Sequence, residues 1–476
     1  MSLSSATVVA DDNDEQGAIN QLMQRARAAQ AQFGNATQEQ VDAAVTAIAW
    51  SLYKPENAKA LAEMAVEDTG LGNVTDKITK NTRKTFGTLR DLLRVKSVGI
   101  IEELPDKGLV KYAKPVGVVA AVTPSTNPAA TPVNKAMMAI KGRNAIIIAP
   151  SPAGLNTTTR VVDLMRDALA KVGQPKDLVQ VLPPPISKQS TNALMQVCDL
   201  SVVTGSQNNV KAAYSSGKPA IGVGAGNVPV IIDSTADFDD AAQKICASKT
   251  FDNSTSCSSE NSLIIMNDVY GDAIQALQRA GGYLATTDEK EKIQQSLWQD
   301  GKLNRHLIAK DADIFAQLVG LPDNTQQANF FMVEETGIGS GFPFSDEKLA
   351  LVLTVYRAQD FDHAESLVRD ILDFKGRGHS CGIHTTNMDN AHRLAENLDV
   401  VRVLVNQAHT FGNGGGFNSG LNFTLSMGCG TWGGNSISEN LNYKNFLNIT
   451  HVSTIIPEDK PTEEELFGSY WAKYGK

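Results

Sequence analysis

Cys257 is the side chain in this sequence best suited to nucleophilic chemistry. It lies in the polar segment 251–260 (Phe-Asp-Asn-Ser-Thr-Ser-Cys-Ser-Ser-Glu), between an apolar helical stretch at 241–247 and a strand-like run at 263–266. A thiol on such a loop is neither held in apolar surroundings nor part of a disulfide pattern, so it can ionise and attack a carbonyl carbon. Because a lone cysteine is more often inert packing, the prediction of a nucleophile depends on the groups around it.

Two further segments could assist a nucleophile. Asn127 follows a strand-like run and lies in Thr-Pro-Ser-Thr-Asn-Pro, residues 123–128, where a fixed amide can direct its N–H groups at developing negative charge. The alternative is a tight turn. His379, in Gly-Arg-Gly-His-Ser-Cys, is the residue type most easily poised for proton transfer near neutral pH, although a single histidine is more often structural.

Three glycine-containing segments are candidates for cofactor contact. Thr-Gly-Ser at 204–206 ends a strand and precedes a helical segment, so it could hold a phosphate or be an ordinary helix cap. Gly-Val-Gly-Ala-Gly at 222–226 has the composition of a dinucleotide fingerprint, but a strand at 228–232 follows it where a helix is required. The segment 409–420 contains five glycines in twelve residues and is either a pocket wall or a flexible connection.

The elements that would position these groups form two patterns. Residues before about 95 predict helices: a capping box at 37–40 begins one, a second covers 55–69, and a third covers 73–93. A hairpin is expected at 98–112. Short apolar strands then alternate with helical segments, which predicts parallel sheets covered on both faces and hence two α/β domains. The strands are expected at 118–122, 145–149, 178–182, 200–203, 263–266, 351–356, 381–384 and 400–405.

Composition limits the class of protein. A chain of 476 residues with net charge −9 predicts two or three globular domains and disfavours nucleic acid or an anionic membrane as partner. No apolar run approaches the ~20 residues that span a bilayer, and residues 1–14 lack the pattern of a secretory signal. Five scattered cysteines without a CxxC pair indicate reduced thiols in the cytoplasm and, with no zinc-type histidine spacing, no structural metal.

Together these segments resemble the aldehyde dehydrogenase superfamily over nearly the whole chain, and most closely its CoA-acylating branch. The resemblance implies an aldehyde dehydrogenase-like fold: a nicotinamide-binding domain (1–97 and 117–238), a catalytic domain (239–435), and a hairpin-based oligomerisation element with a C-terminal tail (98–116 and 436–476). It also implies a homodimer or homotetramer. The segments that carry the resemblance are Glu67–Gly72, Thr123–Pro128, Thr204–Ser206, Phe251–Asn253 with Cys257, Glu347–Leu349, Gly378–His379 and Met427–Gly434.

The resemblance also implies a role for each site residue. Cys257 would attack a small aldehyde, its backbone N–H and the Asn127 side chain would stabilise the oxyanion, and His379 would assist proton transfer when CoA attacks the thioester. Glu347 would hold the nicotinamide ribose, and Gly205 and Ser206 the pyrophosphate. The residues expected to contact NAD or NADP are Thr123, Pro124, Ser125, Ser151, Gly205, Ser206, Gly224, Glu347 and Leu349.

Two departures from the superfamily pattern are informative. Hydrolytic members carry a water-activating Glu where this chain has Val223, so the thioester is expected to pass to CoA. Many members have Lys-Pro-Ala-Glu where residues 151–154 are Ser-Pro-Ala-Gly; without that carboxylate a 2′-phosphate is not repelled, and NAD and NADP both remain open. The alternatives to this function are a hydrolytic dehydrogenase, a non-redox cysteine acyltransferase and an inactive scaffold.

Three segments bear on the choice of substrate. Residues 255–261, residues 376–384 and the glycine-rich loop are most similar to those of acylating sulfoacetaldehyde dehydrogenases. A sulfonate would need cations or strong hydrogen-bond donors near Cys257. Arg402, Arg305 and the hydroxyls of Ser254–Ser256 are the candidates. Acetaldehyde and succinate semialdehyde remain alternative substrates.

Overall fold

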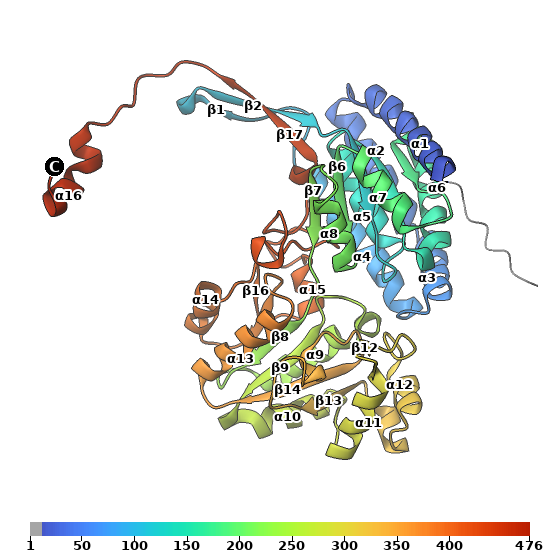
Figure 1. Cartoon of the computed structure of the whole chain (residues 1–476), viewed down its shortest axis with the longest axis vertical. Coiled ribbons are helices and arrows are strands. Elements are labelled where there is room, and N and C mark those ends of the chain that lie inside the picture. Colours follow the sequence, from blue (N-terminus) through green and yellow to red (C-terminus); the bar gives the residue numbers. More distant parts are fainter. Residues whose placement is uncertain (1–11) are drawn as a thin grey trace, which may run out of the picture.

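The chain folds into two α/β bodies and an arm that extends from the first of them (Figure 1). The structure is a computed structural model, and it describes residues 12–476. Residues 1–11, which carry most of the segment used to argue against a secretory signal, lie outside this range. No helix of the described residues is long and apolar enough to cross a membrane.

The first body is built on a five-stranded parallel sheet with the order β5-β4-β3-β6-β7. Every residue of β3 and β4 is buried, which explains their uninterrupted apolar sequences. Both strands have the predicted bounds. The strands are β3 (Val118–Val122), β4 (Ala145–Ala149), β5 (Val179–Val181), β6 (Leu200–Thr204) and β7 (Ala220–Val223).

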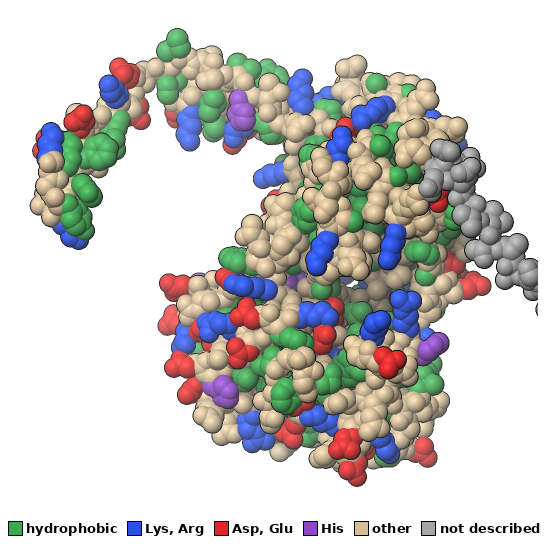
Figure 2. All heavy atoms as spheres, viewed as in Figure 1, with side chains coloured by type: hydrophobic (Ala, Val, Ile, Leu, Met, Phe, Trp, Pro, Cys, Tyr) green, Lys and Arg blue, Asp and Glu red, His purple; other side chains and the backbone are tan. Residues whose placement is uncertain are grey.

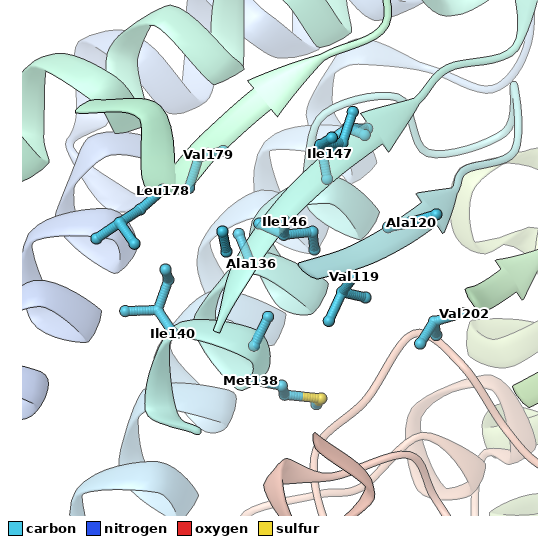
Figure 3. Close-up of a cluster of buried hydrophobic side chains, with 14 of the residues drawn as sticks. Val119, Ala120, Ala136, Met138, Ile140, Ile146, Ile147, Leu178, Val179 and Val202 are labelled. Atoms are coloured by element: carbon cyan, nitrogen blue, oxygen red, sulfur yellow. The ribbon is translucent and has the colours of Figure 1, made fainter. Parts of the chain in front are cut away.

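Eight helices surround this sheet, and α5 is buried along its whole length. Figure 3 shows Ala136, Met138 and Ile140 of α5 beside Val119 and Ile146 of the sheet. The predicted capping box at Thr37 opens α2, and the next two predicted helices are α3 and α4. The helices are α1 (Asp12–Phe33), α2 (Gln38–Tyr53), α3 (Pro55–Thr69), α4 (Val74–Leu93), α5 (Ala130–Lys141), α6 (Leu155–Lys171), α7 (Lys188–Val197) and α8 (Gln207–Tyr214).

The strand order of the first sheet determines where a ligand can bind. From β3 the chain adds β4 and β5 on one side and then returns to place β6 on the other side of β3. Such a switch point leaves a crevice at the carboxyl ends of the two strands. Lys135 links the two strands beside this crevice, because its ammonium donates to the carbonyls of Val122 at 2.7 Å and Val202 at 2.9 Å.

The second body contains a seven-stranded parallel sheet with the order β10-β13-β14-β9-β8-β15-β16. Its strands are β8 (Val228–Ile232), β9 (Glu260–Met266), β10 (Gly282–Leu284), β13 (Phe330–Glu334), β14 (Val352–Ala358), β15 (Cys381–His384) and β16 (Val403–Val405). Two short strands, β11 (Trp298–Gln299) and β12 (Lys302–Leu303), pair separately. The helices are α9 (Phe238–Thr250), α10 (Tyr270–Arg279), α11 (Thr287–Leu297), α12 (Ala312–Val319), α13 (Phe361–Phe374), α14 (Met388–Asn397) and α15 (His409–Asn413).

The predicted domain boundary at residue 238 is wrong by one strand. Strand β8 pairs with β9 and β15, so it belongs to the second sheet and the chain crosses between the bodies at 224–227. The crossing is only four residues long and joins two buried strands, so no change of sequence pattern marks it. It directs the carboxyl ends of the first sheet toward the amino ends of β8 and β9.

The arm consists of the predicted hairpin and a strand from the C-terminal region. Strands β1 (Gly99–Leu104) and β2 (Leu109–Pro115) are antiparallel, and β17 (Leu447–Ser453) pairs with β2 along its whole length. Beyond it, α16 (Glu463–Tyr474) lies away from both bodies (Figure 1). Apolar side chains are exposed along this arm and on α16 (Figure 2).

Candidate active site

A cleft of about 760 Å³ lies where the two bodies meet. Its walls come from loops at the carboxyl ends of the first sheet and from the segment that precedes β9. Eleven of the twelve predicted site residues line it, which places most of the proposed chemistry in one space. They are Thr123, Pro124, Ser125, Asn127, Ser151, Gly205, Ser206, Gly224, Cys257, Glu347 and Leu349.

The first-body side of the cleft fits a dinucleotide. Thr123 follows β3 and Ser206 follows β6, the two strands of the switch point, and a volume of this size is typical of a cofactor site. Ser206 caps α8 by accepting a hydrogen bond from Asn209 N at 3.4 Å, which leaves the helix N-terminus facing the cleft. The buried Thr123 Oγ1 has no hydrogen-bond partner among the described residues, so the wall retains a free polar group for a ligand.

The departure at Gly154 has a steric reason in addition to an electrostatic one. A Cβ on this residue would lie 2.7 Å from the Pro128 Cβ, so the position has no room for a glutamate without a backbone shift. Ser151 Oγ instead accepts a hydrogen bond from Gly154 N at 3.2 Å and fixes the turn.

Glu347 provides a carboxylate at the border of the two halves of the cleft. Burial raises the pKa of its side chain to about 7. No described residue donates a hydrogen bond to this carboxylate, which leaves both oxygens available to ribose hydroxyls. The same group lies close enough to Cys257 to affect its ionisation, so the neighbourhood of the thiol is not free of carboxylates.

Cys257 lies three residues before β9, at the amino end of the strand that neighbours β8. Gly226 makes this position possible, because a Cβ there would lie 1.8 Å from the Cys257 carbonyl oxygen. Burial, together with the charges of Glu347 and Cys429, raises the pKa of the thiol to about 12. The cysteine is therefore protonated at rest in the ligand-free protein. Val223, at the place of the hydrolytic base, is buried and lines the same cleft.

The loop before Cys257 has an unusual backbone. Asp252, Asn253 and Ser254 are consecutive non-glycine residues with φ values of 50°, 53° and 63°. Each costs on the order of 1 kcal/mol or more relative to ordinary backbone, so surrounding contacts must hold the conformation.

Asp252 supplies most of those contacts, and they come from the first body. Its buried carboxylate accepts hydrogen bonds from Lys77 at 3.1 Å, from Lys80 at 2.5 Å and from the Asn73 backbone N at 3.1 Å. It also accepts from the Thr255 hydroxyl at 2.8 Å. Burial alone would raise the pKa of Asp252, but the two ammonium groups outweigh it and lower the pKa. Helix α4 therefore fixes the loop that carries the nucleophile.

His379 is the predicted site residue that the cleft does not include. It is buried, its Nδ1 lies 2.8 Å from the Ser380 hydroxyl, and its Nε2 has no partner among the described residues. Burial, with the charges of Arg402 and His409, lowers its pKa well below the ordinary value, so the imidazole is neutral. The neutral ring has the form of a proton acceptor, and the burial that keeps it neutral also opposes a lasting positive charge on it.

The candidate sulfonate ligands are only partly in place. Arg305, Thr255 and Ser256 line the cleft, and Ser254 does not. Arg402 is buried and donates to the Asn440 side chain and to the carbonyls of His379 and Gly428 at 2.8–2.9 Å, so its role is to support these segments. Its Nε has no partner among the described residues, and its charge favours the Cys257 thiolate, so Arg402 remains a candidate close to the thiol.

Sequence reasoning missed a group of cations on α4. Lys80, Arg83 and Lys84 line a small cavity beside the cleft. Their spacing of three and four residues puts them on one helix face, and that spacing was the available signal. It is equally typical of a solvated helix face, which is why it did not stand out.

Among the described residues, no group of three or more His, Cys, Asp or Glu side chains could hold a metal ion, and all five cysteines are free.

Comparison with known proteins agrees with this geometry. The aldehyde dehydrogenase family model matches residues 5–300. The sulfoacetaldehyde dehydrogenase (acylating) of Cupriavidus necator is 50% identical over 96% of this chain and 93% of its own length. The succinate-semialdehyde dehydrogenase (acetylating) of Clostridium kluyveri is 39% identical over 94% and 99%. The solved structure of an acetylating aldehyde dehydrogenase from Geobacillus thermoglucosidasius superposes with a TM-score of 0.90 at 34% identity, over 96% of this chain and 100% of that chain.

The chain belongs to the aldehyde dehydrogenase family and, within it, to the acylating enzymes. The predicted family, aldehyde dehydrogenase-like fold and enzyme class are confirmed. The enzyme is a CoA-acylating aldehyde dehydrogenase that uses a nicotinamide cofactor, NAD or NADP, with coenzyme A as co-substrate.

Proposed function

We propose that this enzyme oxidises sulfoacetaldehyde to sulfoacetyl-CoA with NAD(P)+ and CoA, and that it catalyses the reverse reaction as well. The observation that carries the proposal is the cleft itself, where a nucleophilic thiol lies beside an apolar residue at the place of the water-activating base. The 50% identity to an acylating sulfoacetaldehyde dehydrogenase supports this choice of aldehyde.

The first steps rest on Cys257 and Asn127. The thiol passes its proton to solvent in the cleft and the thiolate attacks the carbonyl carbon. The Cys257 backbone N–H and the Asn127 amide stabilise the resulting thiohemiacetal oxyanion. Loss of one such donor typically costs ~2.7–4 kcal/mol in the transition state. The bound nicotinamide supplies the acceptor for the hydride that leaves this carbon, and Cys257 is then a thioester.

Release of the acyl group to CoA depends on the missing carboxylate at position 223, because Glu347, a carboxylate in the same cleft, is assigned to the nicotinamide ribose. Val223 cannot accept a proton, so the thioester persists until the CoA thiol attacks it and Cys257 leaves as a thiol. Exchange of one thioester for another conserves the activated acyl group. We assign proton transfer in this step to His379, whose buried Nε2 lacks a partner among the described residues.

The cofactor contacts follow from the positions of the lining residues. Glu347 holds the nicotinamide ribose, Gly205 and Ser206 the pyrophosphate, and Thr123, Pro124 and Ser125 run beside the dinucleotide, with Ser151, Gly224 and Leu349 completing the wall. Lys188 lies at the N-terminus of α7, which follows β5, the neighbour of β4. Lys188 lines the same cleft as Ser151, and an ammonium group suits a 2′-phosphate.

We further propose that the arm pairs two copies of the chain into a homodimer or a homotetramer in the cytoplasm. Support comes from the exposed apolar residues Leu466, Phe467 and Tyr470 on α16, far from either core. The free thiols are typical of a reducing compartment. Light scattering of the full chain tests the assembly.

An activity panel tests the reaction. Purified enzyme is supplied with sulfoacetaldehyde and NAD+ or NADP+, each with and without CoA. We expect steady NAD(P)H formation and sulfoacetyl-CoA, seen by mass spectrometry, only when CoA is present. Without CoA, NAD(P)H formation should stop after at most one equivalent per site. Full-rate NAD(P)H formation with release of free sulfoacetate in the absence of CoA contradicts the proposal.

Two variants separate the steps. Cys257→Ala should abolish NAD(P)H formation, whereas Cys246→Ala, at another partly exposed cysteine, should leave it unchanged. His379→Gln should retain the first-turnover burst of NAD(P)H and slow the CoA-dependent steady state. Loss of the burst together with the steady state would remove His379 from the transfer step.

A further inference from the structure

A second cavity of about 30 Å³ adjoins the catalytic cleft. Asn127, Ser256, Leu425 and Met427 line both spaces, so the small cavity begins beside the groups that surround the reacting carbonyl. Since a single water needs ~10–15 Å³, the cavity can hold a compact group of a few atoms but not a long chain.

The far wall of this cavity is positively charged. Lys80, Arg83 and Lys84 come from one face of α4. Lys80 is neutralised by Asp252, 2.5 Å away. For Arg83 and Lys84, no carboxylate of residues 12–476 lies within ion-pair distance. Arg83 and Lys84 therefore have no counter-charge among the described residues.

The surroundings of these two cations are apolar. The Arg83 guanidinium lies 5.4–5.8 Å from the ring centres of Phe411, Phe417 and Phe423, and its buried Nε has no hydrogen-bond partner in the described part of the chain. Lys84 Nζ donates to the Gly414 carbonyl at 2.8 Å. Burial and the charges of Arg83 and Lys80 lower the pKa of Lys84 to about 7.

Burying a positive group without an opposite charge is unfavourable, and here only ring faces and one backbone carbonyl offset the lost hydration of Arg83 and Lys84. A bound anion would correct this at once for both groups. The arrangement is therefore stable in the complex and poorly compensated in the free enzyme, as expected of a binding site.

We propose that Arg83 and Lys84 bind the anionic tail of the aldehyde, and that the tail is the sulfonate of sulfoacetaldehyde. The inference rests on the proposed function and adds the residues that select the substrate. A sulfonate offers three acceptor oxygens, which suit the fork of an arginine together with one ammonium. One methylene joins the sulfur to the carbonyl carbon, so the short connection matches the position of the cavity next to Ser256 and Asn127.

The position of the charges also explains selection against neutral aldehydes. Acetaldehyde can reach Cys257, but it leaves Arg83 and Lys84 without a counter-ion. Succinate semialdehyde carries an anion on a longer chain, and the small cavity disfavours it. Preference should therefore fall in the order sulfoacetaldehyde, succinate semialdehyde, acetaldehyde.

The test measures kcat/KM for these three aldehydes, with CoA and NAD(P)+, in the full-length enzyme and in Arg83→Gln and Lys84→Gln. Each variant should lose roughly 10- to 100-fold with sulfoacetaldehyde, mainly through KM, and much less with acetaldehyde, so the ratio of the two falls. Arg83→Lys should restore part of the loss. Arg94→Gln, at an exposed cation at the end of the same helix, should leave the ratio unchanged.

A binding measurement keeps the test independent of catalysis. Sulfoacetate, a non-reacting analogue, should raise the melting temperature of the wild type and fail to do so in either glutamine variant. Equal loss with sulfoacetaldehyde and acetaldehyde, or unchanged protection by sulfoacetate, overturns the inference. A greater loss with succinate semialdehyde than with sulfoacetaldehyde overturns the sulfonate assignment. If sulfoacetate raises the melting temperature of the wild type but the enzyme oxidises no aldehyde, the proposed function is wrong while the anion site is supported.

Discussion

Gly226→Ala should displace the Cys257 backbone relative to the other groups of the active site. The added Cβ would lie 1.8 Å from the Cys257 carbonyl oxygen, 2.6 Å from its carbonyl carbon and 2.9 Å from its Cβ. Contacts of a Cβ below 3.0 Å are essentially never seen, so the Cys257 backbone has to move by about 1 Å. A misplacement of that size can cost ~100-fold in rate even when every catalytic group is present.

The assay compares kcat/KM with CoA, the first-turnover burst and thermal melting. We expect kcat/KM to fall roughly 100-fold and stability to fall by about 1–3 kcal/mol, the usual cost of overpacking. Gly271→Ala is the matched control, because nothing lies within 4 Å of its added Cβ and its φ is ordinary. Activity of Gly226→Ala within a few-fold of wild type, with an unaltered melting temperature, would show that the Cys257 backbone is not held at this contact.

Three further predictions concern the cleft. Because the pKa of Cys257 is raised to about 12, alkylation by iodoacetamide in the ligand-free enzyme should accelerate about tenfold per pH unit from pH 7 to 10; a plateau near pH 8 or 9 would contradict the raised value. Glu347→Gln removes a negative charge from the neighbourhood of the thiol at pH 9, where Glu347 is ionised, so Cys257 should be alkylated faster at that pH while KM for NAD(P)+ rises roughly 10- to 100-fold; slower alkylation would place Glu347 elsewhere in the mechanism. Lys188→Ala should weaken NADP+ more than NAD+, measured as the ratio of the two kcat/KM values; an equal effect on both would exclude contact with a 2′-phosphate.

Much of the fold could be predicted because its signals are local. Strands β3 and β4 are continuous apolar runs with polar boundaries, and α3 ends at Gly70 in the left-handed conformation that glycine favours. The apolar run of β13 was overlooked although its first four residues are buried, and strands β7 and β10 were missed for lack of a signal. Strand β7 is four residues long and partly glycine, and β10 has three half-buried residues, so neither has a distinctive pattern.

The glycine-rich segment 409–420 shows that amino-acid composition alone does not predict how a segment packs. It was expected to be either a pocket wall or a flexible connection. The structure forms helix α15 over its first five residues, buries Gly412–Gly416 and places Gly414 in the wall of the small cavity. The glycines allow close packing: a Cβ on Gly414 would meet Lys84 Nζ at 2.6 Å. The reason for a glycine at such a position can be given only when the residue that packs against it is known.

The candidate site could be predicted where motifs carry it and not where it arises from packing. Residues 123–127 and 204–206 follow strands, so their place at the edge of a parallel sheet follows from the pattern. Arg83 and Lys84 belong to no sequence motif. They stand out only in the structure, where no carboxylate of the described residues lies within ion-pair distance of either one. The sequence also could not show that three acceptors engage the Arg402 guanidinium while its Nε stays without a partner among the described residues.

The hydrogen bonds around Asp252 have a consequence for any attempt to recombine members of this family. Because Asn73, Lys77 and Lys80 shape the backbone just before Cys257, the two halves of the enzyme are not interchangeable parts. In a chimera that takes residues 73–80 from one parent and 252–255 from another, the sequence around the nucleophile would be intact. The contacts that hold its backbone conformation would be lost. Both stretches must be transplanted together for the graft to be reactive.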